Sequence, residues 1–451
     1  MSLATLERYD RSRVMTVGEH ATVLGASVGG LLAARVLADA FERVTVIERD
    51  RLDDDTGGRR GAPQARHPHA LLTAGQKVME QLLPGFSDDL VAAGALVLDF
   101  GRDFAFHLEG DFLADGPADM PMYFASRPLI EAVLRARVTD HDAVTVAAGC
   151  QVTGLVPDGD AVGGVQVLRD GERYTLSSDL TVDATGRGSQ AASWLERLGY
   201  PPPAIEQVHV DVAYRTCQIK RPPDDRRMML LAPCAPRTRV GVLAPVEDDR
   251  WLVTVGGLHG DHPPGDFAGM REFAGTLPVP AVRDALDEHA LATPEISHYR
   301  FPAQTRHRYD RLDRLPGRLV SIGDSIASFN PIYGQGMSVA ALEALVLHHV
   351  LADHGPAHLA EPFYARTGDV VEGAWNLAAG ADFMFPQTRG DKPRGADVIN
   401  RYISRLQRRA QIDGQLADTF RRVASMELPP TAVFRPRTVW QVLRSALKGA
   451  A

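Results

Sequence analysis

Cysteine and lysine are both scarce in this chain of 451 residues. The few cysteines show neither CxxC nor metal-ligand spacing, a pattern typical of buried, inert thiols in a reducing compartment; they are Cys150, Cys217 and Cys234. We therefore expect a cytoplasmic protein. The chain also lacks HExxH and GxSxG motifs and any Cys/His cluster, so neither a metal site nor a protein nucleophile is expected.

Long apolar runs and an excess of positive charge are missing as well. No stretch of about 18 apolar residues occurs, so no membrane span is expected. The formal net charge is −8, which excludes the broad basic surface that nucleic acid or an anionic membrane requires, although a local basic patch is compatible with it. Hydrophobic residues make up 45% of the chain. This length and composition predict two closely packed domains, or one large domain with an inserted layer.

The order of apolar segments predicts a mixed α/β fold. A strand over residues 21–25 runs into a Gly-rich turn, a helix begins near Val28, and a second strand covers residues 44–48, which is a βαβ start. Residues 208–258 contain short strands separated by Pro-rich turns, as in an antiparallel sheet. Other predicted elements are a helix over 71–83, strands within 95–125, a helix over 128–138, a helical stretch over 267–290, a strand over 319–323, a buried helix over 335–351, and C-terminal helices in which Ile399, Tyr402, Leu406, Ala410, Leu416, Phe420 and Val423 space as one face.

The turn after the first strand, in TVLGASVGG, has the pattern of a dinucleotide site. Such a turn needs a glycine at the bend, a small residue beside the pyrophosphate, and another where helix and strand pack closely; the helix N-terminus then faces the phosphates. Glu48, at the end of the second strand, is placed to accept the ribose hydroxyls of an adenosine and to repel a 2′-phosphate. The alternative is a tight βα turn with no ligand. The predicted cofactor residues here are Gly25, Ala26, Ser27, Gly29, Gly30, Glu48 and Arg49.

Two further motifs, VDATGRGS at Val182–Ser189 and LVSIGDSIASFNPIYGQGMSVA at Leu319–Ala340, distinguish a flavin site from a nicotinamide site. With the first motif they resemble the group A flavoprotein monooxygenases, which are built on the para-hydroxybenzoate hydroxylase fold. The resemblance implies that Asp324 binds a ribityl hydroxyl of FAD and that a helix N-terminus faces the flavin pyrimidine ring. It assigns the cofactor residues Arg127, Gly186, Gly323, Asp324, Pro331, Gly334, Gln335, Gly336 and Met337.

The resemblance also implies an architecture, namely a Rossmann-like FAD-binding domain of the glutathione-reductase type with an inserted antiparallel substrate sheet and C-terminal helices. On this basis the FAD-binding domain comprises residues 15–94, 126–205 and 303–355. The substrate domain comprises residues 95–125 and 206–302, and residues 356–451 form the helical region. The middle motif departs from the Asp–Gly form common in hydroxylases, and this departure puts direct binding of NAD(P)H in doubt.

Three segments resemble, more narrowly, the flavin epoxidases of polyether biosynthesis: GAPQARHPHALL at Gly61–Leu72, SFNPIYGQGM at Ser328–Met337, and PPTAVFRPRTVW near the C-terminus. In this fold the first segment passes near the flavin, so His67 and His69 are candidates for contact with it or for proton transfer. The competing interpretation is that both are structural histidines. Phe104, Phe106 and residues 383–385 are candidate pocket residues, although core packing is the preferred interpretation for each of them.

The chemistry implied by the resemblance is that of an FAD-dependent monooxygenase. NAD(P)H or a separate flavin reductase supplies electrons, O₂ forms a flavin C4a-hydroperoxide, and one oxygen passes to an apolar alkene or aromatic substrate. Two other enzymes share the fold, an FAD-dependent prenyl or alkene reductase and a flavin halogenase; the latter usually carries a WxWxIP segment and a catalytic lysine. A flavin-binding accessory protein without turnover is the alternative from another class.

Overall fold

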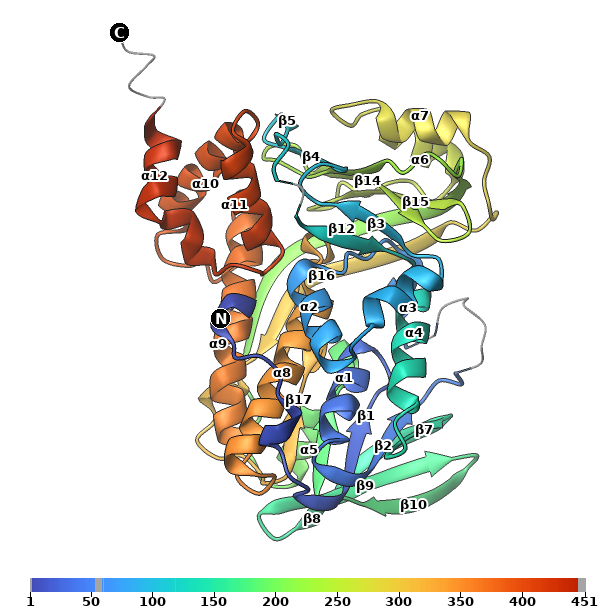
Figure 1. Cartoon of the computed structure of the whole chain (residues 1–451), viewed down its shortest axis with the longest axis vertical. Helices are drawn as coiled ribbons and strands as arrows, with labels where there is room; N and C mark the ends of the chain where they lie inside the picture. Colours follow the sequence, from blue (N-terminus) through green and yellow to red (C-terminus); the bar gives the residue numbers. More distant parts are fainter. Residues whose placement is uncertain (1, 53–58, 60, 118, 445–451) are drawn as a thin grey trace.

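The computed structural model describes residues 2–52, 59, 61–117 and 119–444, and its centre is a parallel sheet. The strands of this sheet are β1 (Gly18–Leu24), β2 (Phe41–Glu48), β7 (Val144–Ala148), β11 (Leu180–Asp183) and β17 (Leu319–Ser321). Their order is β17-β11-β1-β2-β7, with all neighbours parallel (Figure 1). The predicted βαβ start is therefore present, and the carboxyl ends of β1, β11 and β17 meet at one edge of the sheet.

Helices pack against this sheet, and helices and sheet together enclose the main hydrophobic core. They are α1 (Val28–Leu37), α2 (Thr73–Leu82), α3 (Phe86–Ala92), α4 (Arg127–Thr139), α5 (Ala191–Arg197), α8 (Gly336–His354) and α9 (Ala360–Asp382). Helix α8 packs against α1, α2 and α9, and its side chains are buried from Met337 to Leu351. A helix that is apolar on all sides needs such an environment, so the prediction of a buried helix over 335–351 is confirmed.

One described helix, α8, is long and apolar enough to cross a bilayer, but 83% of its most apolar window is buried inside the protein. A buried helix of this kind is what the core of a globular protein contains.

A small antiparallel sheet lies at the far end of the parallel sheet from the cavity described below. It consists of β8 (Cys150–Asp158), β9 (Ala161–Arg169) and β10 (Glu172–Ser177). In Figure 1 this sheet forms the lower edge of the molecule, between β7 and β11 along the chain. It connects β7, at one edge of the parallel sheet, to β11, which lies between β17 and β1.

A large sheet, mostly antiparallel, forms the second layer of the molecule. Its strands are β4 (Phe104–Leu108), β5 (Asp111–Phe112), β12 (Ile205–Lys220), β13 (Met228–Leu231), β14 (Arg239–Val246), β15 (Arg250–Gly257), β16 (Ser297–His307), β18 (Ala327–Ser328) and β19 (Arg389–Gly390). Strands β12, β15, β14 and β13 confirm the antiparallel sheet predicted over 208–258. The pair β3 (Leu96–Asp99) and β6 (Pro121–Phe124) stands beside it. Strand β16 runs through the domain boundary placed at 302/303, and the division into domains stays a prediction.

Two stretches predicted as continuous helices are divided. The stretch 267–290 contains α6 (Phe267–Ala274) and α7 (Ala281–Glu288), because Pro278 and Pro280 interrupt it. The single face predicted from Ile399 to Val423 belongs to α10 (Ala396–Ala410) and α11 (Gly414–Ala424). Asp413 caps α11 by accepting hydrogen bonds from the backbone of Gln415 and Leu416. With α12 (Pro436–Leu443), these helices form a separate bundle at the upper left of Figure 1.

The packing of α1 on β1 predicts a clear stability difference between two adjacent glycines. A Cβ at Gly30 would lie 1.9 Å from the carbonyl oxygen of Gly25, whereas a Cβ at Gly29 would make an ordinary 3.4 Å contact with the Ala340 side chain. We expect Gly30→Ala to lower the free energy of unfolding by about 3 kcal/mol. Gly29→Ala should leave it unchanged or raise it slightly, since alanine favours the helix. Urea unfolding of both variants tests this, and equal stabilities would contradict the close approach.

Candidate functional site

A cavity of about 870 Å³ lies between the carboxyl edge of the parallel sheet and the large antiparallel sheet. In the orientation of Figure 1, its lower part is formed by the turns that follow β1, β11 and β17 and by the N-terminus of α8. Its upper part is formed by β4, β13, β14 and the C-terminal helices. The size suits a cofactor with a small molecule beside it. The three sequence motifs therefore meet at one place, although up to three hundred residues separate them along the chain.

The first motif contributes both the wall of the cavity and the backbone behind it. Ser27, Gly29 and Arg49 line the cavity. Behind them, Gly25 has a φ of +103°, and a Cβ there would lie 2.6 Å from the carbonyl oxygen of Ala184, so glycine is required by both conformation and space. Ala26 donates its backbone N–H to the Glu48 carboxylate at 2.9 Å. Thus Gly25, Ala26, Gly30 and Glu48 support the turn rather than line the cavity.

Glu48 has a second partner that the sequence did not indicate. Arg59 donates to Glu48 at 2.9 Å and to Glu131 at 2.5 Å. The Glu48 carboxylate is therefore engaged by protein groups in this structure, and its predicted contact with ribose hydroxyls stays a prediction. A contact of that kind requires the Arg59 side chain to share or yield one carboxylate oxygen.

Arg127 contacts the first motif directly, and both share the buried carboxylate of Glu131. Its Nη2 donates to the Ser27 hydroxyl at 2.9 Å, and Ser27 donates to Glu131 at 2.6 Å. Burial alone would raise the pKa of Glu131, but the guanidinium groups of Arg127 and Arg59 lower it to about 2. Arg127 also lines the cavity, and its contact with the cofactor stays a prediction. The spacing of Arg127 and Glu131 on α4, four residues apart, was the available signal for this pair.

The second motif is joined to the third by a hydrogen bond. The backbone N–H of Gly186 donates to the Ser325 hydroxyl at 2.9 Å. Arg187, the next residue, stacks 4.6 Å over the Phe301 ring and donates to the Tyr299 hydroxyl at 2.8 Å. Gly186 and Arg187 both line the cavity. This places one positive charge in the wall of the cavity.

Asp324 presents a carboxyl group to the cavity. The turn that carries it is held by the backbone N–H of Gly323, which donates to the buried Glu343 at 2.5 Å. No described side chain forms a hydrogen bond with the Asp324 carboxyl, which lines the cavity beside Arg187 and Arg127. Burial raises the pKa of Asp324, and the two arginines oppose this shift. A hydroxyl-bearing ligand would supply the partner that this acid lacks.

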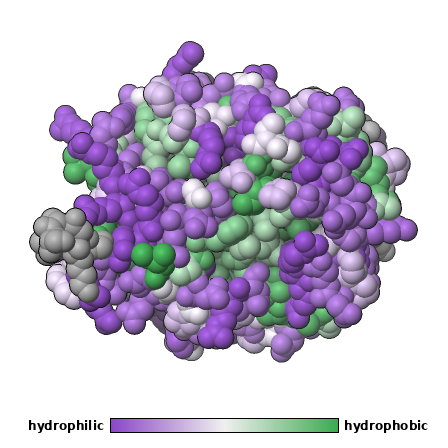
Figure 2. Space-filling model, turned by 90° about the horizontal axis from the view of Figure 1, so that it is seen from above, coloured by the Kyte–Doolittle hydropathy of each residue, from purple (hydrophilic) through white to green (hydrophobic). Residues whose placement is uncertain are grey.

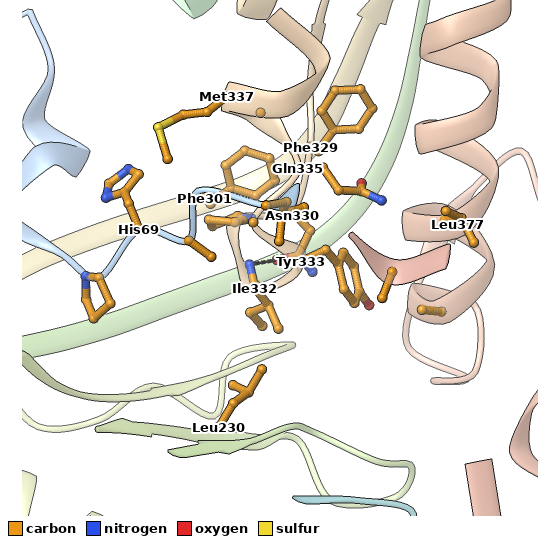
Figure 3. A pocket seen from close by; sticks show the side chains of 18 of the residues that line it. His69, Leu230, Phe301, Phe329, Asn330, Ile332, Tyr333, Gln335, Met337 and Leu377 are labelled. Atoms are coloured by element: carbon orange, nitrogen blue, oxygen red, sulfur yellow. Dashed lines mark hydrogen bonds between the residues drawn. The ribbon is translucent and has the colours of Figure 1, made fainter. Parts of the chain in front are cut away.

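The loop from Pro331 to Met337 forms the floor of the cavity and leads into α8 (Figure 3). Gly334 has a φ of +66° at the turn, and α8 begins at Gly336, so its first backbone N–H groups face the cavity floor. The side-chain oxygen of Gln335 is buried and has no partner among the described residues. Pro331, Gly334, Gln335, Gly336 and Met337 therefore all line the cavity. The donors, the free acid and the glycine turns fit FAD.

The two histidine candidates differ in what they offer. His67 is buried, shares a hydrogen bond of 2.7 Å with the Thr216 hydroxyl through Nδ1, and keeps Nε2 without a described partner. His69 lines the cavity (Figure 3) and donates from Nδ1 to the His67 carbonyl at 2.9 Å, so its Nε2 carries a lone pair and has no hydrogen-bond partner among the described residues. Burial lowers the pKa of His67 to about 3 and that of His69 to about 4. Both rings are therefore neutral near pH 7.

The upper part of the cavity is apolar. Phe104, Phe106, Met384 and Phe385 line it, while Phe383 packs in the core instead. Other apolar lining residues are Phe100, Met122, Phe124, Met228, Leu230, Val242, Leu377, Ile403, Phe420 and Val433. Figure 2 shows a band of hydrophobic residues across the upper face, between two hydrophilic flanks. Ile399 and Phe434 line the cavity and are 44% and 42% exposed, which marks where it reaches the surface.

Asp324 is expected to be a main determinant of FAD retention. Asp324→Ala removes an acceptor that has no other partner, so we expect FAD affinity to fall at least about tenfold, corresponding to a loss of about 1.4 kcal/mol or more. Asp324→Asn keeps an acceptor oxygen, so its affinity for FAD should fall less. Flavin fluorescence titration of the apoprotein measures both. Full FAD occupancy of Asp324→Ala after gel filtration would contradict the assignment.

The neutral state of His67 predicts acid sensitivity. An unfolded histidine has a pKa of about 6.5, above the folded value of about 3, so the unfolded chain binds the proton first. The contribution of neutral His67 to the free energy of unfolding is fully present above about pH 6.5. It is lost as pH falls, and the loss reaches about 2 kcal/mol at about pH 5. Urea unfolding at both pH values should show a smaller loss for His67→Gln than for wild type. The control His358→Gln changes an exposed histidine and should show the same pH dependence as wild type. The same change in the free energy of unfolding with pH in all three proteins would refute the buried neutral ring.

Comparisons with known proteins show the family to which the chain belongs. The profile of the family described as FAD binding domain matches residues 19–356. Protein Rv3254 of Mycobacterium tuberculosis (strain ATCC 25618 / H37Rv) is 32% identical over 468 residues, covering 97% of this chain and 96% of the relative. The 6-methylpretetramide 4-monooxygenase of Streptomyces rimosus is 25% identical over 340 residues, covering 73% of this chain and 74% of the relative.

Solved structures share the fold at low sequence identity. The flavin-dependent brominase Bmp2 aligns with a TM-score of 0.67 and 17% identity over 96% of this chain and 99% of the brominase. This likeness concerns the fold alone, whereas the family match covers most of the chain and includes all three motifs. The chain therefore belongs to the FAD-binding family of the group A flavoprotein monooxygenases, with the para-hydroxybenzoate hydroxylase fold, and it is an oxidoreductase whose cofactor is FAD.

Proposed function

We propose that this protein is a monooxygenase that places one oxygen atom of O₂ on an apolar alkene or aromatic substrate, by epoxidation or hydroxylation. NAD(P)H, or a separate flavin reductase, supplies the electrons. The observation that carries the proposal is the continuity of the cavity, which joins the FAD motifs at one end to an aromatic and aliphatic chamber at the other. A large apolar chamber beside a flavin site suits an apolar substrate better than a charged one.

The proposed reaction is balanced without a protein nucleophile. For hydroxylation, RH + O₂ + NAD(P)H + H⁺ gives ROH + H₂O + NAD(P)⁺, and an alkene gives the epoxide with the same balance. FAD, when bound, supplies the two-electron chemistry with oxygen. The chain binds and orients the reactants, excludes water from the chamber, and supplies the single proton that the balance requires.

Particular residues support these roles. The first backbone N–H groups of α8 and the side chains of Arg127 and Arg187 place positive potential around the lower part of the cavity. That potential stabilises negative charge on a reduced cofactor. The free Nε2 of His69 is a hydrogen-bond acceptor for a cofactor or substrate donor, and its neutral state suits this role.

A halogenase of this fold would need a lysine at the cavity. The described lysines, Lys77, Lys220 and Lys392, are absent from its lining, and Lys77 instead pairs with Glu427. The relative from Streptomyces rimosus carries the name of a monooxygenase. Both observations favour oxygen transfer over halogenation.

The test is incubation of the FAD-loaded protein with NADH or NADPH, ¹⁸O₂ and a panel of polyene, terpenoid and aromatic polyketide substrates. The expected product is one ¹⁸O atom heavier than its substrate. A product two hydrogens heavier and free of ¹⁸O would identify an alkene reductase. Bound FAD that every donor and substrate leaves oxidised would identify the accessory protein.

The chamber and the cofactor site should respond separately to substitution. Phe106→Asp places a charge among the apolar lining residues, so we expect KM for an apolar substrate to rise at least about tenfold while FAD content stays at the wild-type level. Phe106→Leu keeps the chamber apolar and is the matched control. Steady-state kinetics and flavin absorbance measure both quantities. Unchanged KM in Phe106→Asp would place the substrate elsewhere.

A further inference from the structure

Asp382, the last residue of α9, is a buried acid next to the floor of the cavity. Its exposed fraction is 0%. Its Oδ1 accepts hydrogen bonds from the Tyr333 hydroxyl at 2.8 Å and from the Asn330 amide at 2.9 Å, and its Oδ2 accepts one from the Gln304 amide at 2.5 Å. Three neutral donors converge on this carboxyl, and no described ion pair includes it. An acid placed in this way is costly to keep charged.

Tyr333 connects this acid to the cavity. It belongs to the floor loop and lines the cavity together with Asn330, Ile332 and Gln335 (Figure 3). Its hydroxyl donates to the Asp382 carboxyl at 2.8 Å, so a residue of the cavity lining is bonded directly to the buried acid. Asn330 and Gln304 donate only from amide groups, which do not exchange protons in catalysis at neutral pH. A proton leaving Asp382 therefore has a direct route through Tyr333.

We propose that Asp382 and Tyr333 form a proton relay that delivers to the cavity the one proton consumed by the reaction. The proposal rests on the monooxygenase function proposed above. With Asp382 neutral, its O–H donates to the Tyr333 oxygen, and the Tyr333 O–H is free to donate into the cavity. In the transfer step Tyr333 gives its proton to an oxygen atom bound there and receives the Asp382 proton. No electrons move, Tyr333 ends as a neutral phenol, and the Asp382 carboxylate takes up a proton before the next turnover.

The direction of the Tyr333–Asp382 hydrogen bond makes the relay depend on pH. When Asp382 is ionised, Tyr333 must donate to it and has no proton to offer the cavity. Burial raises the pKa of Asp382 to about 7, against the hydrogen bonds from Tyr333, Asn330 and Gln304, and burial raises the pKa of Tyr333 well above its usual value. On the other side of Asp382, the Thr388 hydroxyl donates to its backbone carbonyl, and His259 lies beyond Thr388 at 3.5 Å. The relay is therefore active below about pH 7 and inactive above it.

The first experiment follows the carboxyl directly. Infrared difference spectra of the oxidised FAD-loaded enzyme, taken across the pH range from about 5 to about 9, should show a protonated carboxyl band that disappears with a midpoint near pH 7 and is missing from Asp382→Asn. Tyr333→Phe keeps the acid, so its band should remain with a shifted frequency. If Asp382→Asn does not fold, the shift in Tyr333→Phe still identifies the band. An Asp382 carboxyl that stays in one state across the range overturns the relay.

The second measurement is the pH profile of product formation. The rate of product formation by wild type should fall about tenfold per pH unit above the midpoint, as expected for one ionising acid. Asp382→Asn and Tyr333→Phe should form product at least about a hundredfold more slowly at low pH, and their rates should not show this fall at high pH. Thr388→Val removes the hydrogen bonds of the Thr388 hydroxyl to the Asp382 backbone and to His259 but leaves the Asp382 carboxyl and its three donors in place, so it should keep the wild-type profile. If the rate of Asp382→Asn falls at high pH as the wild-type rate does, the relay is overturned. If wild type itself forms no oxygenated product, the function proposed above fails, while the infrared titration still decides the state of Asp382.

Discussion

The close approach of three strand ends is the constraint on which the rest of the structure depends. The turns after β1, β11 and β17 come from residues far apart in the chain, yet a Cβ at Gly25 would lie 2.6 Å from the Ala184 carbonyl oxygen, and the Gly186 N–H bonds to Ser325. The approach at Gly25 is possible only because glycine has no side chain there, whereas the bond from Gly186 to the Ser325 hydroxyl ties the second turn to the third. The parallel register of the sheet holds the three turns in place, and the cavity above them follows from that arrangement.

Three acids in or behind the cavity wall differ in their hydrogen-bond partners, and this difference predicts a different role for each of them. Glu131 has two arginines and stays charged, so it is a fixed anchor for Arg127 and Ser27. Asp324 lines the cavity with no described hydrogen-bond partner, which suits a ligand contact. Asp382 has only neutral donors, so its charge responds to pH in the range where an enzyme works. The cavity lining thus contains a ligand acceptor, while an anchor and a titratable acid lie behind it.

The sequence predicted the parts of this site that depend on local geometry. Gly25, Gly30, Gly323 and Gly334 were recognisable because a turn or a close contact requires glycine at each, and the long apolar helix α8 was recognisable because its composition requires burial. The upper chamber was only partly predictable. Phe104 and Phe106 look the same in sequence whether they face a core or a cavity, and only the pairing of β4 with β13 places them at a chamber wall.

Other elements depended on contacts that no local pattern reveals. Arg59 lies in a Gly- and Arg-rich loop and meets Glu48 and Glu131 only in the fold. Asp382 reaches Tyr333 across 49 residues, and an acid at the end of a helix has no distinctive sequence signal. The division of 267–290 into α6 and α7 was readable in hindsight from two prolines, whereas the separation of α10 from α11 depended on the cap at Asp413.

The most direct test of the account is the visible absorption spectrum of the purified protein, followed without oxygen after adding NADH or NADPH and again after air is readmitted. The account predicts flavin absorption near 370 and 450 nm (approximate values for any bound flavin) that bleaches with the donor, or with a donor and a flavin reductase, and returns with oxygen. A colourless protein that FAD does not restore would contradict the central claim that the three motifs hold this cofactor.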